Sequence, residues 1–327
     1  MVNSSNSSDG IQNKLERYTW TSYFLFGLLS SLIGDTLILI ASFQRQAFKI
    51  SKFLVAIIQH IAVSDLANAI IFLLPTAISL TTDSWILGDK VCYGLFYIGQ
   101  SLYPTGMFLI AVLTTSKLLI LRYPLRVASW SRKRAHQVGT LIWVSSLTCP
   151  LIFLLVDRDD VYFDYRTYNC DYMYTADVWK EILPVVFFIY GVVPSICIVA
   201  TTILTLKYLA DAGQSARHVR GNVPWQGTFT VVTTAVVYCI STLPYFLLQI
   251  AGIFVKEHSS HSLYVISHRV TYFLLMINII SNFYIYTLTI KSFRKFLCSK
   301  VLTLASVSRL SSRKITRSAT GEEQGFV

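Results

Sequence analysis

Seven long apolar runs restrict what this chain can fold into more than any other feature of its sequence. All but one of the runs exceed the roughly 20 residues that a helix needs to cross the hydrocarbon core of a bilayer, and the fourth run comes close to this length. Among open-ended structures, only a helix satisfies all its backbone hydrogen bonds within lipid. The runs extend approximately over Trp20–Phe43, Phe53–Leu80, Tyr93–Leu121, Val138–Val156, Trp179–Tyr208, Gln226–Val255 and Val265–Ile290. The sequence therefore predicts an all-α membrane protein built as a seven-transmembrane helix bundle.

The composition excludes an ordinary soluble fold for these 327 residues. Hydrophobic residues make up 54% of the chain and charged residues only 14%, whereas soluble domains carry about 25% charged residues. The net charge of +11 is compatible with nucleic-acid binding or with a membrane topology signal. Because the basic residues stand between the apolar runs, they favour the topology signal, and no nucleic-acid partner is expected. No nucleophile–base pair is apparent in the sequence, so an enzyme is not expected either.

The distribution of charge predicts which side of the membrane each segment faces. With the N-terminus outside, the inner loops and the C-terminal tail hold 20 of the 28 lysines and arginines and only three acids. The outer segments hold the other eight basic residues and twelve acids. Lysine and arginine in short loops favour the cytoplasmic side. We therefore expect a multi-pass protein of the cell membrane with an extracellular N-terminus and a cytoplasmic C-terminus.

The predicted organisation has one membrane domain flanked by polar segments. Residues 1–19 form an extracellular segment, 20–290 the bundle, 291–298 a short amphipathic eighth helix and 299–327 a cytoplasmic tail expected to be disordered. The extracellular segment carries no apolar core of a signal peptide, so the first helix is expected to direct its own insertion.

Both ends of the chain carry predicted modification sites. The predicted eighth helix has three apolar residues at helical spacing among basic ones, as an interfacial helix does: Phe293, Phe296 and Leu297. Cys298 follows them directly and is a predicted lipidation site. Near the N-terminus, two Asn-x-Ser sequons predict glycosylation at Asn3 and Asn6.

Two of the six cysteines fall in polar loops that the topology places outside. Cys92 and Cys170 can therefore oxidise to a disulfide, and two free thiols are the alternative. The other four lie within or beside apolar runs or on the basic side, and their spacing matches no metal-ligand cluster.

A series of short motifs accompanies the predicted helices in chain order. The series comprises Gly34-Asp35-Thr36-Leu37, Ile61-Ala62-Val63-Ser64-Asp65-Leu66, Trp85-Ile86-Leu87-Gly88 before Cys92, Ser116-Lys117-Leu118, Arg122-Tyr123-Pro124-Leu125-Arg126, Trp143, Cys170, Pro194, Leu243-Pro244-Tyr245, Asn282-Phe283-Tyr284-Ile285-Tyr286 and Ser292-Phe293-Arg294-Lys295. Their order and spacing resemble those of rhodopsin-like (class A) G-protein-coupled receptors over roughly residues 20–298. Within that family the chain is closest in character to peptide receptors.

The resemblance implies a receptor that senses an extracellular ligand, with a peptide as one candidate, and signals through a heterotrimeric G protein. Arrestin is a further implied partner, and lipid surrounds the bundle. A pair like Cys92 and Cys170 ties the third helix to the second outer loop in the family. Two other functions stay open. One is a receptor-like protein that binds ligand without ordinary G-protein coupling, and the other is a transporter or channel, although the inverted repeats typical of transporters are not evident.

The chain departs from the family pattern at switch positions. Asp35 replaces asparagine, Ser116-Lys117-Leu118 replaces Asp-Arg-Tyr, Thr242 replaces tryptophan and Phe283 replaces proline. Lysine keeps the charge of arginine but lacks its planar fork, and serine cannot form the usual ion pair with it. We therefore expect weakened coupling or raised basal activity. The residues expected to carry switching and coupling are Ser116, Lys117, Pro244, Asn282 and Tyr286.

The resemblance also places six side chains towards the outer half of the bundle, where they would form an aromatic ligand pocket with a few polar groups. They are Phe96, Gln100, Tyr103, Tyr245, Gln249 and Tyr272, and a packing role is the alternative for each. Gly99 stands where amine receptors carry an aspartate, so no counter-ion for a small ammonium ligand is expected. Met276 stands where opsins carry the retinal-binding lysine, so no retinal cofactor is expected.

The predicted second outer loop, residues 157–172, is rich in aromatic residues and acids. Residues 161–168 can pair as a β-hairpin beside the cavity. Such a hairpin would favour a basic or amidated peptide through its negative charge. The alternative is a solvated loop whose acids only avoid the positive-inside signal.

Two carboxylates lie within the apolar runs, where acids are costly enough to count as functional candidates. In the family an aspartate like Asp65 coordinates sodium, so a sodium ion is one cofactor that the resemblance allows. Asn278 and Asn282 can add oxygen ligands, whereas Gly106 offers no hydroxyl. We expect Asp35 to lie beside Asp65 and to share a proton or a cation with it. The alternative is two carboxyls that bond only to backbone or water.

Overall fold

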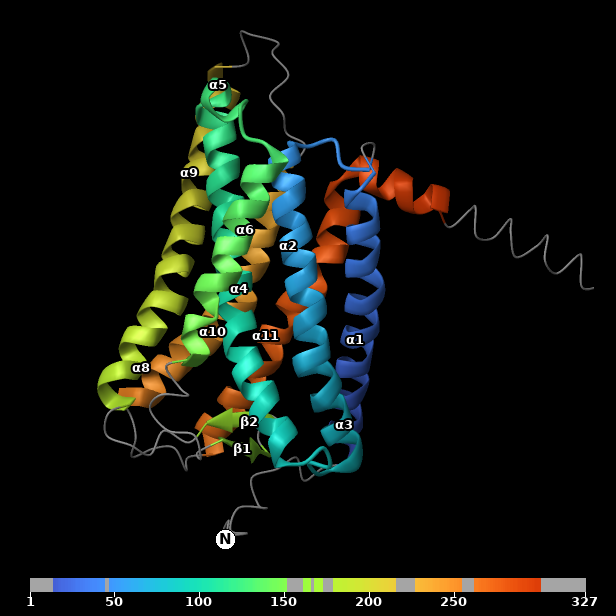
Figure 1. Ribbon diagram of the computed structural model, residues 1–327, viewed down its shortest axis with the longest axis vertical. Coiled ribbons are helices and arrows are strands. Elements are labelled where there is room, and N and C mark those ends of the chain that lie inside the picture. Colours follow the sequence, from blue (N-terminus) through green and yellow to red (C-terminus); the bar gives the residue numbers. More distant parts are fainter. Residues whose placement is uncertain are drawn as a thin grey trace, which may run out of the picture.

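Helices of the chain run side by side and form one elongated bundle with a small β-hairpin at one end (Figure 1). We call the end that carries the hairpin the hairpin end, and the other one the opposite end. The computed structural model describes residues 14–44, 47–151, 161–165, 168–172, 179–215, 227–254 and 262–300.

The elements follow one another in an up-and-down order. They are α1 (Lys14–Ser42), α2 (Lys52–Asn68) continued by the π-helical turn η1 (Ala69–Leu73) and α3 (Leu74–Thr82), α4 (Asp89–Arg122), α5 (Pro124–Val127), α6 (Arg132–Ser146), β1 (Val161–Asp164), β2 (Asn169–Tyr172), α8 (Trp179–Phe187) continued by η2 (Phe188–Val192) and α9 (Val193–Ser215), α10 (Thr228–Phe254) and α11 (Ser262–Thr289). Residues 291–300 form a further helix that turns away from the bundle at the opposite end (Figure 1).

Within the described residues, six helices are long and apolar enough to cross a membrane. They cover Lys14–Ser42, Lys52–Thr82, Asp89–Arg122, Pro184–Asp211, Thr228–Leu248 and Ile266–Thr289. These spans correspond to all the predicted apolar runs except the fourth, so the structure agrees with a helical membrane protein. The first span is described from Lys14, ahead of the predicted Trp20, and Arg17 in its first turn forms an ion pair with Asp83.

The fourth predicted run, Val138–Val156, differs most from the structure. Its helix, α6, begins at Arg132, because the Ser131 hydroxyl accepts a hydrogen bond from the backbone N–H of Arg134 and caps the helix ahead of the apolar residues. The part of this helix described as α6 has 15 residues. It packs against α2 and α4 and supplies the seventh helix of the bundle.

Both π-helical turns lie just before a proline. Pro75 follows η1 and Pro194 follows η2. A proline has no N–H to donate to the preceding turn, and a wider turn accommodates the missing bond. Each turn also shifts the side chains that precede it relative to their positions in an unbroken α-helix.

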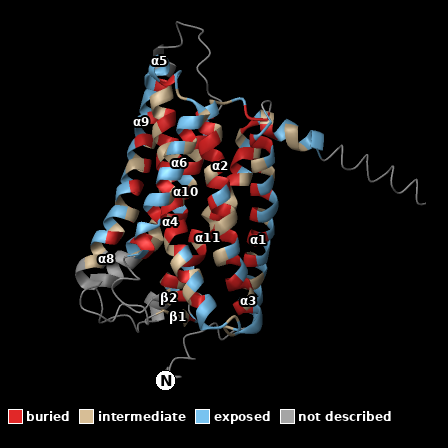
Figure 2. Cartoon of the chain, in the orientation of Figure 1, coloured by how far each residue is buried: buried red, intermediate tan, exposed pale blue. Residues whose placement is uncertain are grey.

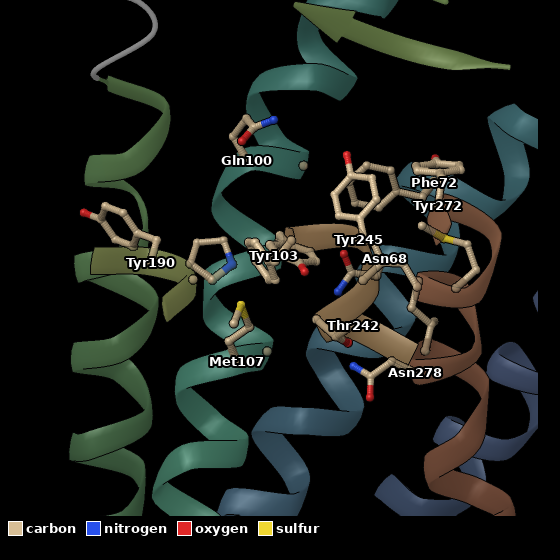
Figure 3. A pocket seen from close by; sticks show the side chains of 18 of the residues that line it. Asn68, Phe72, Gln100, Tyr103, Met107, Tyr190, Thr242, Tyr245, Tyr272 and Asn278 are labelled. Atoms are coloured by element: carbon tan, nitrogen blue, oxygen red, sulfur yellow. The ribbon is translucent and has the colours of Figure 1, made fainter. Parts of the chain in front are cut away.

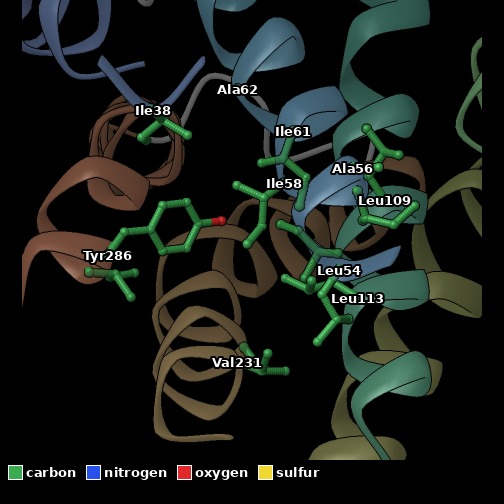
Figure 4. Packing of buried hydrophobic residues seen from close by; sticks show 14 of the residues in the cluster. Ile38, Leu54, Ala56, Ile58, Ile61, Ala62, Leu109, Leu113, Val231 and Tyr286 are labelled. Carbon is green, nitrogen blue, oxygen red and sulfur yellow. The ribbon is translucent and has the colours of Figure 1, made fainter. Parts of the chain in front are cut away.

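Buried residues face the bundle axis, while many large apolar residues on the outer surface are exposed (Figure 2). An apolar outer surface is what lipid requires. In the half next to the opposite end, the interior is a continuous apolar cluster with Ile58, Leu113, Val231 and the ring of Tyr286 (Figure 4). This cluster leaves the hollow part of the molecule to the hairpin half.

The residues after α11 follow the predicted amphipathic pattern. Phe293 is fully buried and stacks on Phe48 with ring centroids 5.1 Å apart. Lys291, Arg294 and Cys298 are exposed. This helix is therefore attached to the bundle by its apolar side.

Candidate functional site

A cavity of about 140 Å³ opens in the hairpin half of the bundle. Side chains from η1, α4, η2, α10 and α11 line it, and residues of β2 contribute at the hairpin. Figure 3 shows several of these side chains converging from different helices. Its walls include five tyrosines, namely Tyr103, Tyr190, Tyr238, Tyr245 and Tyr272. The cavity can therefore accept apolar groups and also offer hydroxyls to a ligand.

Four of the six side chains predicted for a ligand pocket line this cavity: Gln100, Tyr103, Tyr245 and Tyr272 (Figure 3). The Phe96 side chain lies elsewhere, in a buried cluster with Val186 and the two cysteines of the disulfide. Gln249 belongs to α10, but its side chain lies outside the described residues.

Sequence reasoning missed Phe72 and Tyr190, which also line the cavity. Each lies within a π-helical turn, η1 for Phe72 and η2 for Tyr190. Uniform α-helical spacing does not account for the rotation that such a turn introduces. Pro75 and Pro194, two residues beyond the turns, were the sequence signal that could have indicated it.

Gly99 makes room for an aromatic ring. A Cβ atom at Gly99 would lie 2.5 Å from Cζ of Phe72, closer than any side-chain carbon can approach. The space beside Gly99 is thus filled by Phe72, and this wall of the cavity is apolar. An aspartate at this position would have to displace the ring.

The cavity extends inward to Asp65, Asn68 and Asn278. Asp65 is buried and accepts a hydrogen bond of 2.6 Å from Nδ2 of Asn282. Asp35, also buried, accepts one of 2.6 Å from the Ser31 hydroxyl. Three buried atoms of this region have no hydrogen-bond partner among the described residues: Asp35 Oδ1, Asn282 Oδ1 and the Tyr286 hydroxyl.

Two of these three atoms are acceptors only, so the region is rich in oxygen atoms that lack a donor. A small hard cation with oxygen ligands suits such a set. Gly106 adds no ligand, and a Cβ there would lie 3.8 Å from the Ser64 hydroxyl. The residues predicted as ion ligands therefore fit a small cation, with Asp65 reachable from the cavity.

The β-hairpin roofs the cavity and confirms the predicted strand pairing with a small shift. β1 pairs antiparallel with β2 from Val161 opposite Tyr172 to Asp164 opposite Asn169, so the paired strands extend beyond the predicted 161–168. The disulfide between Cys92 and Cys170 is formed and joins β2 to the first turn of α4. The prediction of this disulfide is therefore confirmed.

Hydrogen bonds hold the hairpin from two further sides. Asn169 Nδ2 donates to the hydroxyl of Tyr272 on α11 over 2.5 Å, in the wall of the cavity. The Tyr168 hydroxyl donates to Asp83 over 2.9 Å, and Asp83 forms an ion pair with Arg17 of α1. The hairpin thereby connects α1, α4 and α11.

Asp83 lies just beyond the apolar helix, and its pKa reflects these contacts. Partial burial would raise the pKa of this carboxyl, but the hydrogen bonds from Arg17 and Tyr168 outweigh burial and hold the pKa below its ordinary value. The carboxylate is therefore charged at neutral pH and available to both partners.

Charged residues are few in the lining of the cavity. Of the residues that line it, the only aspartates, glutamates, lysines, arginines or histidines are the two acids Asp65 and Asp171. Asp171 lies on β2 at the hairpin, whereas Asp65 lies at the inner end. Within this lining no basic residue can pair with a ligand carboxylate.

Two of the predicted switch residues lie in the other half of the bundle. Ser116 and Lys117 are both buried on α4. Lys117 Nζ would lie 3.7 Å from a Cβ at Gly227, next to the start of α10, and it forms no ion pair with any described residue. Pro224, near the position where the family pattern would place an acidic partner on the sixth helix, lies outside the described residues.

Phe246 of α10 and Tyr103 of α4 connect the cavity to this half. Pro244 lies inside α10, followed by Tyr245 in the cavity wall and Phe246 one residue later. The Phe246 ring lies 5.3 Å from that of Tyr103, centroid to centroid. Thr242 lines the cavity without an aromatic ring, so Phe246 supplies the aromatic contact between α10 and α4.

A sequence model described as "7 transmembrane receptor (rhodopsin family)" matches residues 34–286, which is most of the chain. The chain belongs to the rhodopsin family of seven-transmembrane receptors. Galanin receptor 2a of Danio rerio is 25% identical over 299 residues, which cover 86% of this receptor and 77% of the relative. Galanin receptor 2b of Danio rerio is 24% identical over 238 residues, covering 69% and 60%.

Melanopsin-B of Xenopus laevis is also similar to this rhodopsin-family receptor, at 27% identity over 139 residues, which cover 42% of this chain and 26% of the relative. In this receptor Met276 lines the cavity, and a thioether cannot form a Schiff base. The prediction that retinal is not its cofactor therefore rests on this position.

The receptor also accommodates Phe283, which replaces the proline of the family pattern. A Cβ at Gly34 of α1 would lie 2.6 Å from Cβ and Cγ of Phe283 on α11. The absence of a side chain at Gly34 thus leaves the space that Phe283 occupies. The two residues fit each other across the helix pair.

Proposed function

We propose that this rhodopsin-family receptor binds a basic or amidated peptide at the hairpin end and activates a heterotrimeric G protein at the opposite end. The observation that carries the proposal is the cavity itself, whose described lining has tyrosine walls, a hairpin roof with Asp171, and no basic residue. A peptide end with a positive or neutral amide group suits this lining, whereas a free carboxylate finds no basic partner in it. The similarity to two galanin receptors supports a peptide ligand.

The proposed orientation puts the hairpin end outside the cell and the C-terminus in the cytoplasm. Its support is the concentration of lysine and arginine in the segments next to the opposite end. Glycosylation at Asn3 and Asn6 belongs to the same proposal, and both residues lie outside the described ones. The exposed Cys298 is proposed as a lipid anchor, and the serines and threonines of the tail as sites for arrestin-directed phosphorylation.

The contacts of Lys117 suggest how the altered switch motif would act. Its ammonium group is buried without an ion pair to any described residue, so the inactive state lacks the usual ionic restraint at this position. We expect basal G-protein activation above that of a receptor with a paired arginine. A Lys117→Arg variant with unchanged basal and stimulated signalling would contradict a special role for the lysine.

A sodium ion is proposed at Asp65, held by this carboxylate with Asp35 and Asn282. The ion would neutralise charge at the inner end of the cavity and stabilise the inactive bundle. The expected result is a higher unfolding temperature of the purified receptor in NaCl than in choline chloride, and an Asp35→Asn variant should change that difference. Equal unfolding temperatures in both salts would contradict the proposal.

The main experiment is a peptide screen on the purified receptor, with thermal unfolding as a readout that does not depend on coupling. Amidated basic peptides should raise the unfolding temperature more than their free-acid counterparts. An Asp171→Asn variant should weaken their binding about tenfold if one charged contact is lost. Asp89→Asn, an exposed acid outside the lining, is the matched control.

G-protein activation by the same peptides, measured in membranes, tests the second half of the proposal. Binding without activation would support the alternative of a receptor-like protein without ordinary coupling. Tighter binding of free-acid peptides than of amidated ones would overturn the proposed ligand class. Tighter binding of neutral lipids than of every peptide tested would overturn it as well.

A further inference from the structure

A connected group of five polar side chains joins α1, α2 and α6 in the half of the bundle away from the cavity. We call it the α2–α6 cluster, and it consists of Ser42, Gln59, His60, Arg132 and His136. Gln59 Nε2 donates to the Ser42 hydroxyl over 2.6 Å. Arg132 Nη2 donates to Gln59 Oε1 over 3.0 Å, and Arg132 Nε donates to Nε2 of His136 over 3.3 Å. Finally, Nδ1 of His136 lies 3.1 Å from Nε2 of His60.

The arginine determines where the protons of both histidines lie. A guanidinium group can only donate, so His136 Nε2 must carry no proton. A neutral imidazole has one N–H, which in His136 is then at Nδ1 and donates to His60. Nε2 of His60 must therefore accept, and it also carries no proton. The geometry is satisfied when both histidines are neutral.

The rings have little freedom to avoid each other. A Cβ at Gly139 of α6 would lie 2.5 Å from Nε2 of His60, so the His60 ring packs directly against the α6 backbone. The guanidinium of Arg132 lies over the ring of Phe43, 5.4 Å from its centroid. Any change in the hydrogen bonding of His60 is thus transmitted to the packing of α2 against α6.

The charged and titratable neighbours of the pair are few. In hydrogen-bond contact, α6 contributes Arg132 and His136 itself, α2 the neutral Gln59, and α1 the neutral Ser42. α4 packs against both α2 and α6 but contributes no hydrogen bond or ion pair to either ring from the residues described. No carboxylate in the described ranges faces the pair to stabilise a second positive charge.

We propose that the α2–α6 cluster is a proton-responsive contact, which holds α6 against α2 while both histidines are neutral and weakens when either one takes up a proton. A proton on His136 Nε2 would face the N–H of Arg132, and a proton on His60 Nε2 would face the N–H of His136. Either event replaces an acceptor by a donor and adds positive charge beside Arg132. Imidazole is the side chain whose charge changes between pH 5 and pH 8, so the contact is expected to be complete at pH 8 and to weaken as the pH falls.

The inference goes beyond the proposed ligand and G protein and does not depend on either. With the proposed orientation, the cluster lies in the cytoplasmic half and would respond to acidification of the cytosol. Because α6 also packs on α4, which carries Ser116 and Lys117, the same event would reach the predicted switch residues.

The test uses the full-length receptor in lipid nanodiscs and follows thermal unfolding between pH 8 and pH 5.5. The wild type should lose on the order of 3 °C more over this range than a double variant, His60→Gln with His136→Asn. In the double variant the asparagine amide can still donate to the glutamine oxygen, but neither side chain titrates. Its unfolding temperature at pH 8 should therefore stay near that of the wild type. His268→Gln, on α11 in the hairpin half, should keep the wild-type pH dependence.

A spectroscopic readout keeps the proposal testable if the double variant folds poorly. Side-chain ¹⁵N spectra of the histidine-labelled wild type at pH 8 should show His136 protonated at Nδ1 and His60 unprotonated at Nε2. A His136 protonated at Nε2 at that pH would overturn the proposal, as would equal pH dependence in wild type and double variant. Stabilisation of the wild type by Zn²⁺, with no effect of pH, would make the pair a metal site and overturn it as well.

Discussion

The two halves of the bundle are held together by different kinds of contact. In the hairpin half, a disulfide and directed hydrogen bonds such as Asn169 to Tyr272 fix the hairpin above a cavity. In the other half, the interior is filled largely by apolar side chains such as Ile58 and Leu113 (Figure 4), and directed hydrogen bonds such as those of the α2–α6 cluster add to this packing. Hollow space removes packing contacts, so the hairpin half depends on bonds that have a fixed direction.

This difference allows one bundle to be rigid at one end and able to rearrange at the other. Directed bonds keep the cavity in one shape, which reduces the ordering that a ligand must impose. Apolar packing carries no such direction, and helices can slide into another packing at moderate cost. The buried Lys117 forms no ion pair with a described residue, so no described ion pair restrains α4 at this position.

Removing the disulfide should have the largest effect and should act on the hairpin half. Cys92 and Cys170 are 78 residues apart, and opening a loop of this length costs about 4 kcal/mol of stability in the chain-entropy account. We expect Cys170→Ser to lower the free energy of unfolding by an amount of that order and to weaken ligand binding. Thermal unfolding and ligand titration of the purified receptor measure both effects. Cys239→Ser is the control. An equal loss of stability in both variants would contradict a special role for the disulfide.

Truncating the apolar interior should come next and should act on the other half. Leu113 is 1% exposed within the apolar cluster, and Leu113→Ala should cost about 3 kcal/mol through lost contacts and a cavity. Leu141→Ala, at a side chain that is 68% exposed on the outer surface, is the matched control. Detergent-induced unfolding measures the difference. If Leu113→Ala loses more free energy of ligand binding than free energy of unfolding, the two halves are coupled more closely than their contacts indicate.

A single hydrogen bond of the roof should have a smaller effect. Tyr272→Phe removes the hydroxyl that accepts from Asn169 and leaves a buried amide donor without its partner, at a cost of about 1–2 kcal/mol. We expect this loss mainly in ligand affinity, because the same hydroxyl lies in the cavity wall. Competition binding compares it with Tyr284→Phe, whose hydroxyl contacts Ser30 outside the cavity. Similar ligand affinities of Tyr272→Phe and Tyr284→Phe would contradict a role of the Asn169–Tyr272 hydrogen bond in ligand binding.

The smallest effect is expected from acid at the hairpin end. The folded state lowers the pKa of Asp83 through Arg17 and Tyr168, against the effect of burial, so this carboxylate stabilises the fold above its ordinary pKa near 4. That contribution should be lost as the pH falls through the lowered pKa, and it should be absent in Asp83→Asn. Unfolding temperatures between pH 6 and pH 3 measure the change, with Asp89→Asn as control. A stability gain of the wild type towards low pH, relative to Asp83→Asn, would reverse the expected sign.

Much of the fold could be predicted from the sequence, because lipid leaves few structural options. Runs of apolar residues fix the number and type of crossings, and the placement of Cys92 and Cys170 in polar loops indicated the disulfide. The start of α6 could not be predicted in the same way. It is decided by the Ser131 cap in a basic stretch, where no apolar pattern marks the helix.

The membrane bundle, the charge asymmetry of its ends and three of the five tyrosines that line the cavity could be predicted from the sequence. Helix packing in three dimensions, by contrast, puts Phe72 and Tyr190 in the lining instead of Phe96, and places the Phe72 ring against Gly99. It also brings His60 into contact with His136, which is 76 residues away in the chain. Periodicity reports which face of one helix is apolar. It does not report how π-helical turns rotate a side chain or which distant residue fills the space that a glycine leaves.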